Sequence, residues 1–164
     1  MLHCTIKDQT VVDVLLVDSV PLVRQLVADM LEDVGLRVIA ATEDAAEAQA
    51  ALARGGSPTP AVLVVAVRCP MGGCSGVVNG RALATELRRR LSYGDDRTGP
   101  QSLGVVYFGE HVSALGGDAL GPAEQFLSEP FGHAALVRAV FGAIGREMPR
   151  WLAGRVRARP ALRA

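Results

Sequence analysis

Two carboxylates of this sequence stand where an extended segment ends. Asp18 follows the apolar run 11–17, and Glu129 stands directly before Pro130. Ligands of open α/β domains gather at the carboxyl ends of the strands, so both side chains are candidates for chemistry there. Together with His111 they would make a small acid/base or metal cluster. The alternative for Asp18 is a carboxylate that only caps the helix behind it.

The cysteines offer a second kind of chemistry. Cys69 and Cys74 lie in the glycine-rich loop 68–80, which is long enough to bring two thiols within disulfide distance. Against a redox pair stand the odd total of three cysteines, the lack of a CxxC motif and the reducing cytosol. Both the redox and the purely structural interpretation stay open.

The elements that position Asp18 are a strand and a helix. The run 11–17 is too apolar for a strand with one wet face, and it fits a parallel sheet covered by helices on both sides. Ser19 is the expected N-cap, and Pro21 suits the first turn. Gly35 is expected to end the helix. The predicted buried stripe of this helix consists of Leu22, Leu26, Met30 and Val34, with Val23, Val27 and Leu31 beside them.

The rest of the chain continues the alternation of strands and helices. Thr42 is expected to cap the second helix, and segment 109–122 is so rich in glycine that a fourth helix there should be short or absent. The predicted fold is a doubly wound α/β domain with a five-stranded parallel sheet. The further strands are 37–41, 61–67, 103–108 and 125–128, and the later helices are 81–91 and 133–144.

Composition predicts a single domain with extensions at both ends. The 164 residues carry 17 basic and 17 acidic side chains, so overall charge indicates neither a nucleic-acid nor a membrane partner. No secretory signal or long apolar span is present, and a cytoplasmic protein is expected. We expect an N-terminal extension at 1–10, a domain at 11–146 and a basic tail at 147–164.

Five separated segments of the chain together form a specific pattern: LLVDSVPLVRQLVADMLEDVGL, VLVVAVRCP, NGRALATELRRR, VVYFGE and FLSEPF. In their order and spacing they resemble the receiver domain of response regulators, the CheY-like, flavodoxin-like module of bacterial two-component signalling. The resemblance implies a sheet order of 2-1-3-4-5 and covers roughly residues 11–146.

The resemblance also implies where the family's phosphorylation site would lie. Asp18 matches the first of two Mg²⁺-binding acids, and the Arg68 carbonyl matches a third metal ligand. The other key positions depart from the family pattern. Ser19 replaces the second acid, Ala66 the phosphoacceptor aspartate, Gly109 the hydroxyl residue, and Glu129 the lysine before a cis-type proline, Pro130.

These departures predict a pseudo-receiver that is not an enzyme. Alanine has no nucleophile, one carboxylate is a poor cage for Mg²⁺, and a glutamate repels phosphate. We therefore expect no cofactor, lost or weak Mg²⁺ binding, and phosphorylation-independent contact with a histidine kinase or another signalling protein. The alternative is a receiver scaffold with new chemistry, as an acid/base, metal or Cys69/Cys74 redox site.

Partner contacts are expected at the C-terminal end of the chain. Phe126 matches the family's aromatic switch residue, although a core role is equally consistent with it. The last helix is too apolar for a narrow buried stripe, which makes Leu136, Val140 and Phe141 interface candidates. After Gly145, six arginines and one glutamate give the tail a net charge of +5, so the rest of the chain carries −5.

Trp151 lies among those arginines. A homodimer or an obligate partner complex is predicted through the last helix and segment 148–156, with Trp151 as the buried anchor. A solvated C-terminal end is the alternative.

Overall fold

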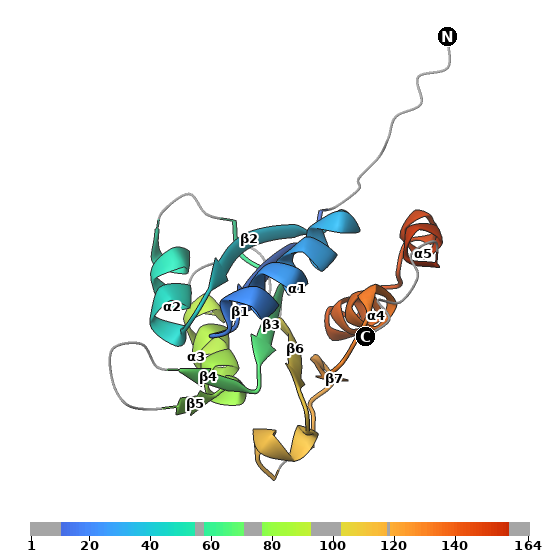
Figure 1. Cartoon of the computed structure of the whole chain (residues 1–164). Coiled ribbons are helices and arrows are strands. Elements are labelled where there is room, and N and C mark those ends of the chain that lie inside the picture. Colours follow the sequence, from blue (N-terminus) through green and yellow to red (C-terminus); the bar gives the residue numbers. More distant parts are fainter. Residues whose placement is uncertain (1–10, 55–57, 71–76, 93–102, 118, 158–164) are drawn as a thin grey trace.

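A central sheet of five parallel strands organises the molecule (Figure 1). The computed structural model describes residues 11–54, 58–70, 77–92, 103–117 and 119–157. The strand order β2-β1-β3-β6-β7 is the predicted 2-1-3-4-5 arrangement, which is confirmed. The strands are β1 (Asp13–Val17), β2 (Arg37–Thr42), β3 (Val62–Ala66), β6 (Gly104–Gly109) and β7 (Glu124–Ser128).

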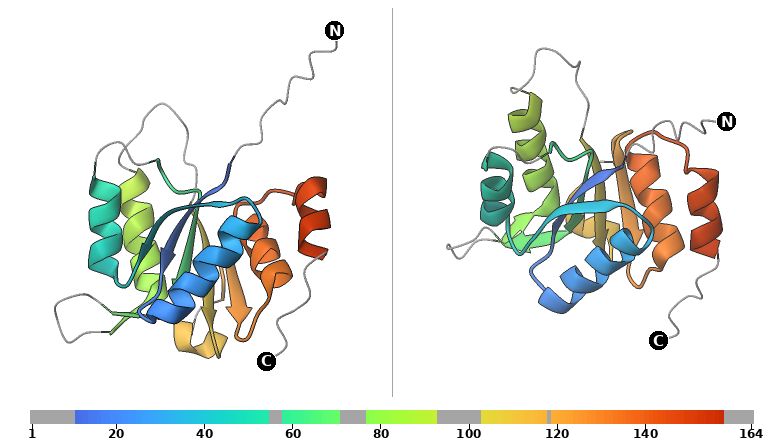
Figure 2. Two further views of the ribbon diagram at one scale, coloured as in Figure 1. Left: turned by 45° about the horizontal axis from the view of Figure 1, so that its top comes forward. Right: turned by 90° about the horizontal axis from the view of Figure 1, so that it is seen from above.

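Helices cover both faces of this sheet. Helices α1 and α4 lie on one face and α2 and α3 on the other, with α5 beyond α4 (Figure 2). In place of a fourth family helix, the described part of the β6–β7 connection contains one 3₁₀ turn, η1 (Val112–Leu115), as predicted. The helices are α1 (Pro21–Asp33), α2 (Ala45–Ala53), α3 (Gly80–Ser92), α4 (His133–Ala143) and α5 (Arg150–Arg157).

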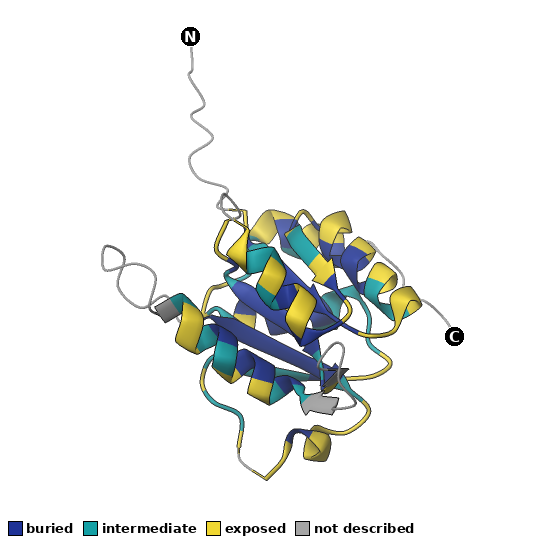
Figure 3. Ribbon diagram, turned by 90° about the vertical axis from the view of Figure 1, so that its left-hand side faces the viewer, coloured by how far each residue is buried: buried dark blue, intermediate teal, exposed yellow. Residues whose placement is uncertain are grey.

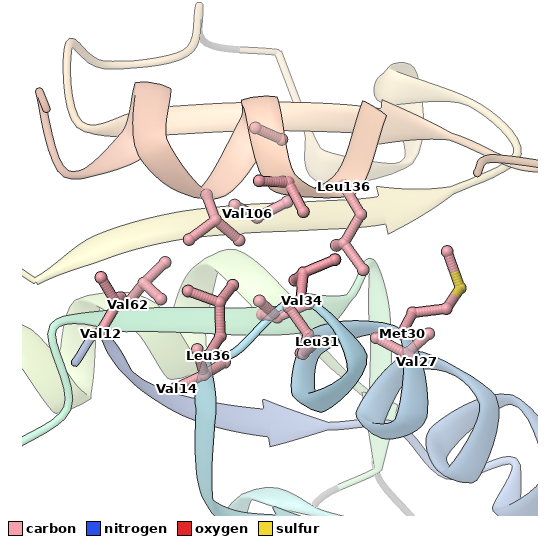
Figure 4. Packing of buried hydrophobic residues seen from close by; sticks show 14 of the residues in the cluster. Val12, Val14, Val27, Met30, Leu31, Val34, Leu36, Val62, Val106 and Leu136 are labelled. Atoms are coloured by element: carbon pink, nitrogen blue, oxygen red, sulfur yellow. The ribbon is translucent and has the colours of Figure 1, made fainter. Parts of the chain in front are cut away.

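The strands supply side chains to two separate cores because neighbouring residues of a strand point to opposite faces. Val14 and Leu16 of β1 lie in the core under α1 and α4, whereas Leu15 and Val17 lie in the core under α2 and α3. Figure 4 shows the first core, where Leu136 of α4 reaches the α1 residues that pack on the sheet. The central strands are buried between helices whose outer sides are exposed (Figure 3).

Two predicted helix caps are wrong. The N-cap of α1 is Val20, whose side chain makes no capping hydrogen bond. The side chain that binds the backbone there is that of Asp18, not Ser19, since Asp18 accepts a hydrogen bond from the Val20 amide. The N-cap of α2 is Asp44, which accepts a hydrogen bond from the Glu47 amide at 2.8 Å. Thr42 instead ends β2.

The predicted stop of α1 is confirmed. Gly35 has a φ of +88°, the left-handed conformation that ends many helices. The predicted apolar stripe is only partly buried, however. Leu22 is 80% exposed and Leu26 47% exposed, whereas Met30 and Val34 are buried. Only the C-terminal half of α1 packs fully on the sheet.

Segment 68–80, expected to be a loop, contains a two-stranded antiparallel hairpin. Its strands are β4 (Arg68–Pro70) and β5 (Val77–Asn79), in which Arg68 pairs with Asn79. Cys74 lies outside the described residues, and so do the side chain of Cys69 and the N-terminal extension 1–10. Within the described part of the chain, no helix is long and apolar enough to span a membrane.

The last two helices correct the predicted interface. Leu136, Val140 and Phe141 are all buried in the domain's own core, so the prediction that they form an exposed interface is wrong. The apolar surface of α4 is wide because α1, the sheet and α5 all pack against it. Leu152 and Val156 of α5 belong to the same core, so part of the predicted tail is an ordered helix.

Candidate functional site

A pocket opens at the carboxyl edge of the sheet, between the ends of β1, β3 and β6. Its volume is about 530 Å³, and six of the predicted site residues line it together with His111. The sequence-based placement of these residues at one edge is therefore reproduced in space. The lining residues are Asp18, Ser19, Val20, Val23, Ala66, Val67, Arg68, Phe108, Gly109, Glu110, His111, Ala114 and Glu129.

Asp18 is the most buried acid of the pocket, with 4% of its surface exposed. Its Oδ1 accepts a hydrogen bond from the Val20 amide at 2.9 Å, and its backbone carbonyl accepts one from Arg24. Burial raises the pKa of Asp18, and the Val20 hydrogen bond and the Arg24 charge offset this only in part. One function of Asp18 is thus structural, because it fixes the backbone at the start of α1.

Glu129 adds a second negative charge at the pocket. It stands in a cis peptide bond with Pro130, the isomer that the resemblance implied. Partial burial raises the pKa of Glu129, although the residue is largely exposed, and the charges of Asp18 and Glu110 raise it further. Glu110 was missed from the sequence, although it directly follows β6 and so reaches the same edge. The electrostatic effect of these three carboxylates favours a cation over a phosphate.

Solved structures with a similar fold include response-regulator receiver domains. The REC domain of PhyR from Erythrobacter litoralis matches 85% of this chain and 95% of its own, with 15% identity and a TM-score of 0.62. CheY4 of Vibrio cholerae matches 79% of this chain and 95% of its own, with 22% identity and a TM-score of 0.55. A receiver protein from Sinorhizobium medicae matches 84% of this chain and 98% of its own, with 21% identity and a TM-score of 0.59. No protein-family model and no curated protein matches the sequence. This chain has the receiver fold.

The end of β3 in this receiver fold presents a methyl group to the pocket. Ala66 is its last residue, and the backbone of α3 approaches it closely. A Cβ built at Gly80 would lie 2.6 Å from the carbonyl oxygen of Ala66, so only glycine fits there. Ala66 thus lines the pocket with an apolar side chain at the position where the resemblance implies an acceptor carboxylate.

The end of β6 leaves little room for a side chain larger than glycine. A Cβ at Gly109 would approach Val67 to 3.1 Å from Cγ2 and 3.3 Å from Cβ, which is tighter than ordinary contact. A serine or threonine would require Val67 to shift by a few tenths of an ångström. Val67 therefore crowds the space that the side chain of a hydroxyl residue would need at position 109.

The residues present do not fit a Mg²⁺ site. Mg²⁺ requires near-octahedral oxygen ligands, usually one or two carboxylates with waters. Asp18 already accepts the Val20 amide, and Ser19 stands in place of a second acid. Among the described residues, no group of three His, Cys, Asp or Glu side chains could hold a metal ion. The Cys69/Cys74 alternative lies outside the described residues.

The predicted switch aromatic lies away from the pocket-lining residues. Phe126 is half-buried against the core under α2 and α3, and Tyr107 is its register partner on β6. This position is consistent with an ordinary core aromatic on an edge strand, and the switch role stays a prediction.

A polar network on the same side was missed from the sequence. The Glu124 carboxylate accepts hydrogen bonds from the Tyr107 hydroxyl at 2.9 Å, the Gly121 amide at 2.9 Å and Arg88 at 3.1 Å. Burial acts to raise the pKa of Glu124, but these hydrogen bonds lower it below its ordinary value. The network fastens α3 to β6 and to the edge strand β7, and its partners are up to 36 residues apart.

Proposed function

We propose that this protein is a receiver-fold module of two-component signalling that is not phosphorylated and acts by protein–protein contact. The observation that carries the proposal is Ala66 at the end of β3, where a methyl group stands in place of an acceptor carboxylate. A histidine kinase or another signalling protein is the expected partner, in the cytoplasm. The solved structures of similar fold support the signalling class.

The charges of the pocket support the same conclusion. Glu129 replaces the lysine that the resemblance implies, and it stands near Asp18 and Glu110. Carboxylates at these positions repel a phosphoryl group and its donors. Without an acceptor, a metal cage or a hydroxyl residue, the pocket has no chemical trigger. The module is therefore non-enzymatic and holds one constitutive conformation for its partner.

Beryllofluoride, a mimic of the phosphoryl group, tests this function. We expect ¹⁹F NMR of the full chain with Mg²⁺ and beryllofluoride to show only the free species, because beryllium has no carboxylate to bind at Ala66. Asp18→Asn is the matched variant, since asparagine keeps the acceptor for the Val20 amide. A bound resonance in the natural protein that disappears in Asp18→Asn would contradict the proposal.

A further inference from the structure

Exposed apolar side chains lie at the start and in the first half of α1, and two glutamates line the pocket beside the start of this helix. Leu22 and Leu26 lie one turn apart on the exposed side of α1, and Val20, 49% exposed, lines the pocket with Glu110 and Glu129. Both glutamates are exposed. We call Val20, Leu22, Leu26, Glu110 and Glu129 the acidic–apolar surface. Three exposed apolar side chains at the start and in the first half of one helix make this side of α1 a candidate interaction surface.

The outer side of α5 has the complementary character. Leu152 and Val156 point into the core, which leaves Arg150, Trp151 and Arg155 exposed. The Arg155 guanidinium lies over the Trp151 ring, 5.8 Å from its centroid, and Trp151 is 44% exposed. We call these three residues the basic–aromatic surface. Tryptophan and arginine are enriched at the energetic centres of protein interfaces.

The two surfaces lie at opposite ends of α1. Leu22 is in the first turn of this helix, whereas the Trp151 ring packs beside Gly35, just past its last turn. A Cβ at Gly35 would lie 3.5 Å from Cη2 of that ring. A two-fold axis that sets two α1 helices antiparallel would bring each surface onto the complementary surface of the other copy. Such a contact closes on itself as a dimer.

We propose that the acidic–apolar surface binds the basic–aromatic surface of a second copy of this chain. Charge favours this occupant, because the C-terminal segment carries +5 and the rest of the chain −5, although the whole chain is neutral. The arginines of one copy compensate the mutually repelling carboxylates of the other, while Trp151 covers the exposed leucines. The inference deepens the proposed function by naming a partner of the same pocket, and it rests on that pocket being unphosphorylated.

Sedimentation equilibrium of full-length charge-reversal variants tests this dimer. We expect the natural chain to dimerise below about 0.1 mM, and each double variant, Arg150→Glu/Arg155→Glu or Glu110→Arg/Glu129→Arg, to bind itself at least about tenfold more weakly. An equimolar mixture of the two variants should dimerise again, because one contact of the mixed dimer keeps the natural charges and the other has both signs exchanged, so both contacts attract. Arg54→Glu, an exposed reversal after α2 on the opposite face, is the control and should leave the dimer intact.

Leu22→Ser provides a second, uncharged test. Its side chain is 80% exposed, so the fold should survive, as judged by thermal unfolding, while the dimer weakens. A monomer throughout the concentration range would overturn the proposal, as would a dimer that neither double variant weakens. Monomers that float with anionic vesicles would assign α5 to a membrane instead. A monomer leaves the beryllofluoride result unchanged, so failure of this inference is distinguishable from failure of the proposed function.

Discussion

Substitution of Leu152 tests whether α5 is part of the folded domain. Its side chain is fully buried in the core under α1 and α4. Leu152→Ala removes three carbon groups at about 0.8 kcal/mol each, which gives about 2.4 kcal/mol. The site lies at the edge of the domain and can partly collapse, so we expect a loss near the lower end of the usual range of about 2–5 kcal/mol.

Gly154→Ala, in the same helix, is the matched substitution that should raise stability where Leu152→Ala lowers it. Gly154 is exposed and helical, and a Cβ there would meet nothing within 4 Å. Alanine should therefore stabilise the protein by about 0.5–1 kcal/mol. Urea unfolding followed by circular dichroism measures both variants, and Leu152→Ala should also lower the melting temperature by about 5–10 °C. If neither substitution changes stability, α5 is a solvated end and this reasoning is refuted.

Three further substitutions test the pocket and the polar network. Glu129→Gln should stabilise the protein by about 0.5 kcal/mol at pH 7. The pKa of Glu129 is higher in the folded than in the unfolded chain, so its ionisation lowers the free energy of unfolding as pH rises. The stabilisation by Glu129→Gln should therefore vanish below pH about 4, as measured by urea unfolding at a series of pH values. Gly80→Ala should cost about 1–3 kcal/mol by thermal unfolding, since its Cβ would press on the Ala66 carbonyl; an unchanged melting temperature contradicts this. Tyr107→Phe should cost about 1 kcal/mol by removing one donor to Glu124; no loss would mean that the hydroxyl contributes nothing.

Much of the fold could be predicted because its signals are local. The apolar run before Asp18 and the glycine at position 35 depend on a few neighbouring residues, and the structure confirms both. The exposed Leu22 and Leu26 show the limit of such patterns. Periodicity shows which side of α1 is apolar, but it does not show how far the sheet extends beneath the helix.

Features that depend on distant residues were not predictable in the same way. Glu124 and Arg88 are 36 residues apart, and no local pattern marks them as partners. The spacing of Leu152 and Val156, four residues apart, could have indicated the inward side of α5. The basic charge around them pointed instead to a solvated tail or a partner. Asp18, Glu129 and His111 could be expected at the strand ends from the local pattern, whereas the assignment of Ala66 and Gly109 to the same site came from the resemblance.

The central claim is that the pocket no longer accepts a phosphoryl group. Intact-mass spectrometry after incubation of the full chain with acetyl phosphate and Mg²⁺ tests it most directly, with Ala66→Asp as the variant that restores a carboxylate at the end of β3. We expect the mass of the natural chain to stay unchanged. A stoichiometric, acid-labile phosphoryl adduct on the natural chain would contradict it.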